Sequence, residues 1–175
     1  RTPQITSAPA AKAPAQSIDP SNPDVSALKG KFSVENLEMI KGMVGGLAAR
    51  LQDNPDDYDG WMRLGRAYTV LENTGGAKDA YTRAAKLKPT ELAPKLQLAD
   101  FLARQTDFTR PLPADLVKVA VDIHAIDPKV PDALFIIGLD KANKGDTKAA
   151  RTLWQSALDV LPTETPLRAE IARRM

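Results

Sequence analysis

The feature that most constrains this chain is a pattern of large and small apolar residues that occurs twice with the same spacing. The first copy starts at Tyr58, and its residues are Trp61, Leu64, Gly65, Tyr68, Ala77, Tyr81, Ala84 and Pro89. The second copy starts at Pro131, and its residues are Leu134, Ile137, Gly138, Ala150, Trp154, Ala157 and Pro162. Within each copy, intervals of three and four residues place these side chains on one face of each of two helices. The pattern therefore predicts helix pairs that repeat after roughly 34 residues.

This spacing resembles the tetratricopeptide repeat. The first copy fills every signature position, with Tyr81 in place of the usual phenylalanine, and the second departs only at Lys141. A less regular unit lies between them and carries Lys95, Leu98, Ala99 and Leu102 at the corresponding positions. Its later half fits the register only if residues are inserted near 105–113, so we expect a long elbow loop there.

We therefore predict an all-α protein that forms a tetratricopeptide-repeat superhelix over residues 32–175. The helix pairs are expected at about 58–91, 92–130 and 131–164. One helix of about twenty residues, capped by Ser33, should precede the pairs, because apolar residues recur at helical spacing up to a turn at Asn54. A short helix at 166–174 should end the array.

Glycines inside the predicted helices need a packing reason, because a helical glycine costs roughly 1 kcal/mol relative to alanine. We interpret Gly65 and Gly138 as points where two helices approach closely, and Trp61 and Tyr68 as core residues rather than ligand contacts. The pairs at 45–46 and 75–76 lack the sequence context of a phosphate-binding loop and are predicted to be turn and packing glycines.

Composition separates residues 1–31 from the rest of the chain. This segment contains five of the fourteen prolines and few large apolar residues, so it is predicted to be a flexible Pro/Ala-rich linker, with a leader remnant as the alternative. The remainder carries equal numbers of basic and acidic residues, which argues against a nucleic-acid partner. No cysteine is present and His124 is the single histidine, so we predict no metal site, no cofactor and no enzymatic activity.

Residues that the repeat does not need for its own packing are the candidates for binding. In tetratricopeptide repeats the first helix of each pair turns such residues toward a concave groove. The predicted peptide-binding residues are Met62, Arg63, Arg66, Leu96, Gln97, Asp100, Arg104, Phe135, Ile136 and Leu139. We expect the apolar residues near position 135 either to line the groove or to be covered by another segment of the chain.

A more specific resemblance covers residues 38–162. It rests on MIKGMVGGLAARLQDNPDDYDGWMRLGRAYTVLE and on DIHAIDPKVPDALFIIGLDKANKGDTKAARTLWQSALDVLP, with the helix before the first repeat, the long elbow and the late tryptophan. This succession resembles the periplasmic repeat domain of the CcmI/CycH cytochrome c biogenesis family. The resemblance implies a periplasmic chaperone, tethered by an N-terminal membrane anchor outside this chain, that binds the C-terminal helical segment of apocytochrome c. It also implies delivery of that cargo to the haem ligation complex.

Two other interpretations of the sequence stay open. A general interaction scaffold of the bacterial cell envelope would use the same groove for an extended tail of another protein. An accessory module of an enzyme would leave the chemistry to another part of a longer chain.

Overall fold

In the computed structural model, the described residues 34–175 form eight helices and no strand. The helices are α1 (Val34–Asp53), α2 (Tyr58–Val70), α3 (Thr74–Leu87), α4 (Leu92–Arg104), α5 (Ala114–Ile126), α6 (Pro131–Asn143), α7 (Thr147–Val160) and α8 (Pro166–Arg174). The predicted all-α repeat fold, with a preceding helix and a short last helix, is confirmed. The predicted linker at 1–31 and the predicted cap Ser33 lie outside the described residues.

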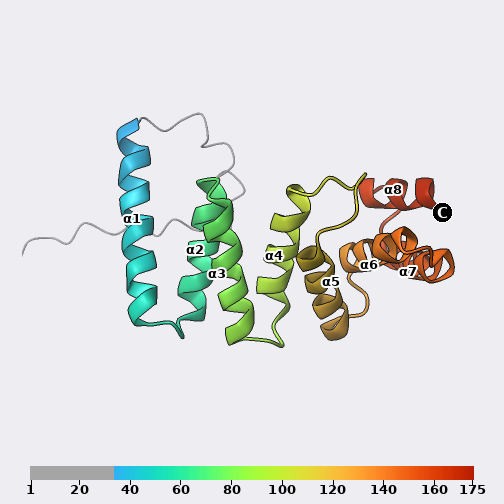
Figure 1. Ribbon diagram of the computed structural model, residues 1–175, viewed down its shortest axis with the longest axis horizontal. Helices are drawn as coiled ribbons and strands as arrows, with labels where there is room; N and C mark the ends of the chain where they lie inside the picture. Colours follow the sequence, from blue (N-terminus) through green and yellow to red (C-terminus); the bar gives the residue numbers. More distant parts are fainter. Residues whose placement is uncertain (1–33) are drawn as a thin grey trace, which may run out of the picture.

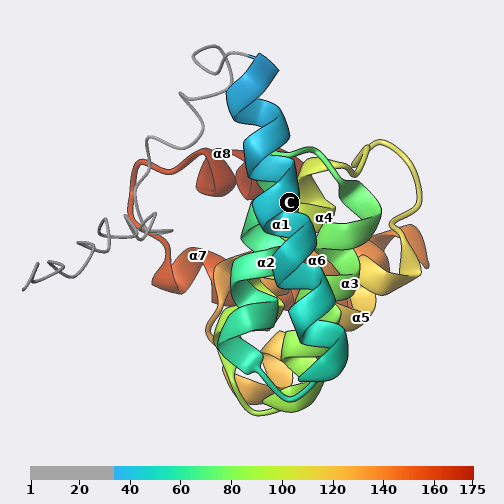
Figure 2. The same cartoon turned by 90° about the vertical axis from the view of Figure 1, so that its left-hand side faces the viewer.

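The helices form an elongated array in which neighbours in sequence are neighbours in space (Figure 1). Each substantial helix contact joins consecutive helices, from α1 on α2 through to α7 on α8. Figure 2 shows the array from the α1 end, with the later helices lying behind. Such an array has a continuous core without long-range pairing, so its stability depends on contacts within each pair and with the next.

The closest approach in two helix pairs is made by a glycine facing an aromatic ring. A Cβ on Gly65 of α2 would lie 2.6 Å from the ring of Tyr81 on α3, and one on Gly138 of α6 would lie 2.3 Å from Nε1 of Trp154 on α7. Both rings are almost fully buried. The prediction that these two glycines are contact points between helices is confirmed.

Two different side chains make the same bond at the start of successive pairs. Trp61 donates from Nε1 to the carbonyl of Pro55 at 2.7 Å, and the ammonium group of Lys95 donates to the carbonyl of Pro89. Each donor occupies the same repeat position and reaches back to the proline that ends the preceding helix hairpin. This explains how a lysine, buried to 7% exposure, replaces a large apolar residue.

The glycine pairs at 45–46 and 75–76 match the predicted turn and packing roles only in part. Thr74 to Gly76 belong to α3 rather than to the preceding turn, because Asn73 caps the helix by accepting a bond from the amide of Gly76. Gly76 does pack closely, against the ring of Tyr68. Gly45 and Gly46 lie in the middle of α1 and face open space, so the prediction of turn or packing roles was wrong for that pair.

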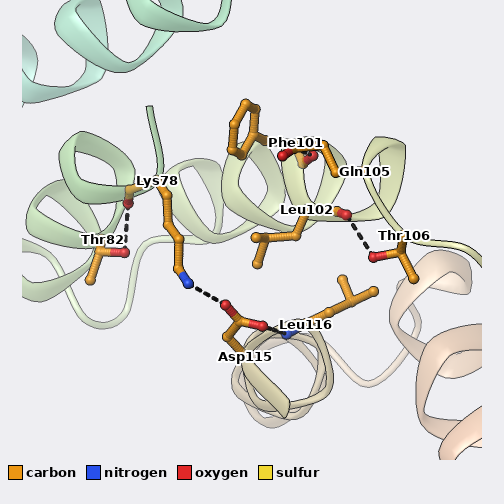
Figure 3. A network of polar contacts seen from close by, with 8 residues as sticks. All are labelled: Lys78, Thr82, Phe101, Leu102, Gln105, Thr106, Asp115 and Leu116. Atoms are coloured by element: carbon orange, nitrogen blue, oxygen red, sulfur yellow. Dashed lines mark hydrogen bonds and ion pairs between the residues drawn. The ribbon is translucent and has the colours of Figure 1, made fainter. Parts of the chain in front are cut away.

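The predicted elbow is confirmed as residues 105–113, between α4 and α5. Gln105 and Thr106 donate to the carbonyls of Phe101 and Leu102, which satisfies free acceptors at the end of α4 (Figure 3). An ion pair between Lys78 on α3 and Asp115 on α5 then links the second helices of two successive pairs (Figure 3). These contacts set where the chain leaves α4 and where α5 docks.

Candidate functional site

The ten residues predicted to face a groove lie on α2, α4 and α6. The structure leaves Arg63, Leu96, Gln97, Asp100 and Arg104 exposed and Arg66 half-buried. It buries the other four, which are Met62, Phe135, Ile136 and Leu139. The polar members of the predicted set therefore lie at the surface, and its apolar members are buried except for Leu96.

A hollow of about 390 Å³ lies between α4 and α6, and we call it the α4–α6 hollow. Its lining residues are Leu96, Gln97, Ala99, Asp100, Ala103, Phe108, Ile123, Val130, Asp132, Ala133, Phe135, Ile136 and Leu167. Most of these side chains are apolar. Half of the predicted groove residues line it, namely Leu96, Gln97, Asp100, Phe135 and Ile136. Its volume falls within the range of small binding clefts.

Phe135 is the aromatic residue of α6 at this hollow. Its ring lies 6.2 Å from the ring of Phe108 in the elbow, centroid to centroid, and the guanidinium of Arg174 lies 5.9 Å from its centroid. Behind it, Trp154 donates from Nε1 to the Phe135 carbonyl at 3.3 Å. Phe135 is held from several sides and keeps 8% exposure, so it forms a preorganised wall rather than a mobile flap.

The elbow and α8 together close one side of the hollow. Leu167 of α8 lines it, and α8 is anchored by Ile171, which is fully buried, and by Arg168, which donates to the carbonyls of Leu158 and Leu161. That the surplus apolar residues of α6 line a peptide-binding groove stays a prediction. Phe135 and Ile136 line a hollow, and other segments of the same chain restrict access to them.

Five of the predicted residues do not line the α4–α6 hollow. Met62 and Leu139 are 4% and 3% exposed and belong to the core. Arg63, Arg66 and Arg104 lie on α2 and α4 outside the lining. A direct contact of any of these five with a peptide stays a prediction.

Charged side chains of α2 and α4 act on the hydroxyl of Tyr81. The pKa of this phenol lies above its ordinary value, chiefly because the group is buried, and the charge of Asp100 raises it further. A hydrogen bond with Thr69 and the charges of Arg66 and Arg104 act in the opposite direction. The hydroxyl oxygens of Thr69 and Tyr81 are 3.5 Å apart. Three predicted groove residues therefore share one electrostatic environment next to the hollow.

Sequence reasoning missed Phe108 and Leu167 as lining residues. Both come from segments outside the paired helices, so the repeat register contains no information about them. Phe108 is nevertheless the single aromatic residue of the elbow, and Leu167 is the one leucine of α8. An aromatic residue in an insertion was the available signal for the first of them.

Other chemistry is sparse within residues 34–175. His124 is half-buried, and among the described residues its buried Nδ1 has no hydrogen-bond partner. No group of three potential metal ligands occurs among the described residues. None of the described helices is long and apolar enough to cross a membrane.

Stacked helix pairs with glycine–aromatic contacts and an apolar hollow on the first helices of the pairs define a tetratricopeptide-repeat protein. The chain belongs to a particular family of this class, described as Cytochrome c-type biogenesis protein H TPR domain, whose family model matches residues 29–168. The resemblance inferred from the sequence is thereby confirmed.

Named relatives agree with this assignment. The chain is 30% identical over 148 residues to "Cytochrome c-type biogenesis protein CcmH" of Escherichia coli (strain K12), a match that covers 84% of this chain and 41% of the relative. It is 45% identical over 56 residues to "Cytochrome c-type biogenesis protein CycH" of Rhizobium meliloti (strain 1021), which covers 32% of this chain and 15% of that protein. The chain thus spans about two fifths of the length of the Escherichia coli relative.

Among solved structures, the one titled "MamA RS-1 ArsTM double mutant" superposes with a TM-score of 0.59 at 16% identity. The match covers 86% of this chain and 83% of that one. At this identity the similarity supports the fold alone.

Proposed function

We propose that this chain is the cargo-binding domain of a periplasmic chaperone for cytochrome c maturation. Its cargo would be apocytochrome c, held through the C-terminal helical segment and passed to the haem ligation complex. The observation that carries the proposal is the α4–α6 hollow, because a preformed apolar cleft on the inner side of a helical array suits an amphipathic helix. Family membership supplies the biological setting.

Apolar and polar residues of the groove would contact different sides of the bound helix. Leu96, Phe135 and Ile136 would contact the apolar stripe of the bound helix, and Met62 and Leu139 would support that wall from the core. The cations Arg63, Arg66 and Arg104, with Gln97 and Asp100, would meet polar groups at the edge of the helix. Apolar burial would supply most of the free energy of binding.

A chaperone of this kind must bind an unfolded cargo and release it. Ordering a flexible segment costs about 2 to 5 kcal/mol, so we expect affinity in the micromolar range, roughly −8 kcal/mol. Holocytochrome c, whose terminal helix packs in its own folded core, would bind much more weakly. That difference would give delivery its direction.

The proposal describes a carrier without catalytic groups or a cofactor of its own. In the longer protein, an N-terminal membrane anchor outside this chain would hold the domain in the periplasm. The groove would keep the cargo near the membrane-bound ligation machinery. The alternative, a general interaction scaffold of the cell envelope, would accept other tails with similar affinity.

The test is titration of fluorescently labelled apocytochrome c and holocytochrome c with the chain, followed by anisotropy. Leu96 is 38% exposed at the hollow, and its replacement by serine should weaken apocytochrome binding about fivefold through lost apolar contact. Val121→Ser is the matched control, because Val121 is 47% exposed on α5 and does not line the hollow. Equal affinity for the apo and holo forms would contradict the chaperone function, and an unaffected Leu96→Ser variant would move the site elsewhere.

A further inference from the structure

The charged residues that line the α4–α6 hollow are both acidic. They are Asp100 on α4 and Asp132 in the first turn of α6, and the remaining lining residues are apolar apart from Gln97. Because both charged lining residues are negative, the hollow suits a cationic ligand better than an anionic or a neutral one. Its charge selects for cations next to apolar groups.

Asp132 has no counter-charge within residues 34–175. It is exposed in the first turn of α6, and none of the ion pairs or side-chain hydrogen bonds of these residues includes it. Asp100 is paired with Arg104 one turn away at 3.0 Å, but both side chains are more than half exposed. An exposed pair of this kind is weak and exchanges easily with a competing cation.

A second arginine near the hollow, Arg174, already has partners within the chain. Arg174 lies over the ring of Phe135, and its guanidinium bonds to Glu170 at 2.6 Å. Arg63 and Arg66 on α2 form no ion pair among the described residues. Unpaired positive charge therefore lies on α2, and unpaired negative charge lies at the hollow on α6, where Asp132 is.

We propose that the α4–α6 hollow anchors a cationic amphipathic helix, with a lysine or arginine of that helix paired to Asp132 and an adjacent apolar side chain seated against Phe135 and Ile136. The inference rests on the proposed function and narrows it, because it states the charge class of the segment that the groove holds. The proposal also fixes the orientation of the bound segment along the array. The basic part of the segment lies over α6, and its acidic part lies over Arg63 and Arg66 on α2.

Two synthetic peptides of roughly 20 residues, about 30 Å long as helices, provide the probes. They share one leucine stripe, and one carries lysines beside the stripe where the other carries glutamates. Anisotropy titration of the full chain at low salt should show the lysine peptide binding about tenfold tighter. Asp132→Asn should weaken that peptide about threefold, and Asp132→Lys should remove the preference for it.

Asp56→Asn is the matched control. Asp56 is an exposed carboxylate in the turn before α2, so the variant removes the same charge away from the hollow and should bind both peptides as the wild type does. Circular dichroism should show unchanged helix content in each variant. Equal binding of the two peptides, or equal effects of Asp132→Asn and Asp56→Asn, would overturn the inference.

Titration of apocytochrome c beside the peptides separates this inference from the proposed function. Tight lysine-peptide binding without apocytochrome binding would support the cationic site and contradict the chaperone. Apocytochrome binding that is unaffected by Asp132→Lys would support the chaperone and contradict the cationic site. If neither peptide binds and apocytochrome c does not bind either, the cationic site and the chaperone function are both contradicted.

Discussion

Replacing Gly138 by alanine tests whether the glycine–aromatic contact sets the spacing of α6 and α7. The new Cβ would lie 2.3 Å from Nε1 and 2.6 Å from Cδ1 of Trp154, far inside van der Waals contact. Trp154 is 4% exposed and its Nε1 bonds to the Phe135 carbonyl, so the ring has little room to move. Either the ring or the helix must shift.

The expected change in the free energy of unfolding combines opposing effects. Overpacking of a filled core costs about 1 to 3 kcal/mol, and weakening the Trp154 bond adds about 1 kcal/mol. Alanine recovers roughly 1 kcal/mol of helix propensity. We therefore expect Gly138→Ala to be destabilised by about 1 to 3 kcal/mol.

Gly45→Ala is a matched control in the same chain. Gly45 is also inside a helix, but a Cβ there would meet nothing within 4 Å, so only the propensity gain of up to about 1 kcal/mol remains. The two variants should change stability in opposite directions in urea unfolding followed by circular dichroism. Adding Trp154→Phe, which removes the clashing pyrrole edge, should recover part of the loss. A Gly138→Ala variant as stable as the wild type would refute the packing argument.

Two further predictions concern polar contacts that join neighbouring helix hairpins. Lys95→Met should lower the free energy of unfolding by about 1 to 3 kcal/mol, because it removes the bond from the buried ammonium group to the Pro89 carbonyl, and a chemical denaturation curve identical to that of the wild type would contradict this role. The bond from Lys78 lowers the pKa of Asp115 below its ordinary value of 3.8, so the carboxylate stabilises the fold above that pH and loses this effect as the pH falls through the lowered pKa. Both side chains are nearly half exposed, so Asp115→Asn should cost at most about 1 kcal/mol at pH 7 and less as the pH falls below 3.8, measured as the difference in urea midpoints; a pH-independent difference would exclude the ion pair as its cause.

The sequence by itself determined the helices and their order. Apolar residues recur at the helical period, and proline, asparagine and the polar insertion mark the ends, so each helix is specified by neighbours close along the chain. The register also determined the contact of Gly65 with α3 and of Gly138 with α7, because partners within one hairpin are separated by a short, regular turn. The same argument failed at Gly45 and Gly46, which have helical spacing but meet no partner helix in the part of the chain that the structure describes.

Only the tertiary structure decided the shape and charge of the candidate site. The apolar pattern of α6 showed more apolar residues than the repeat needs, but not that Phe108 of the elbow and Leu167 of α8 close around the same hollow. Nor did it show that Met62 and Leu139 are buried, or that Asp132 has no counter-charge among residues 34–175. The physical reason is that local periodicity states which side of a helix must avoid water, whereas the segment that covers it is chosen by contacts distant in sequence.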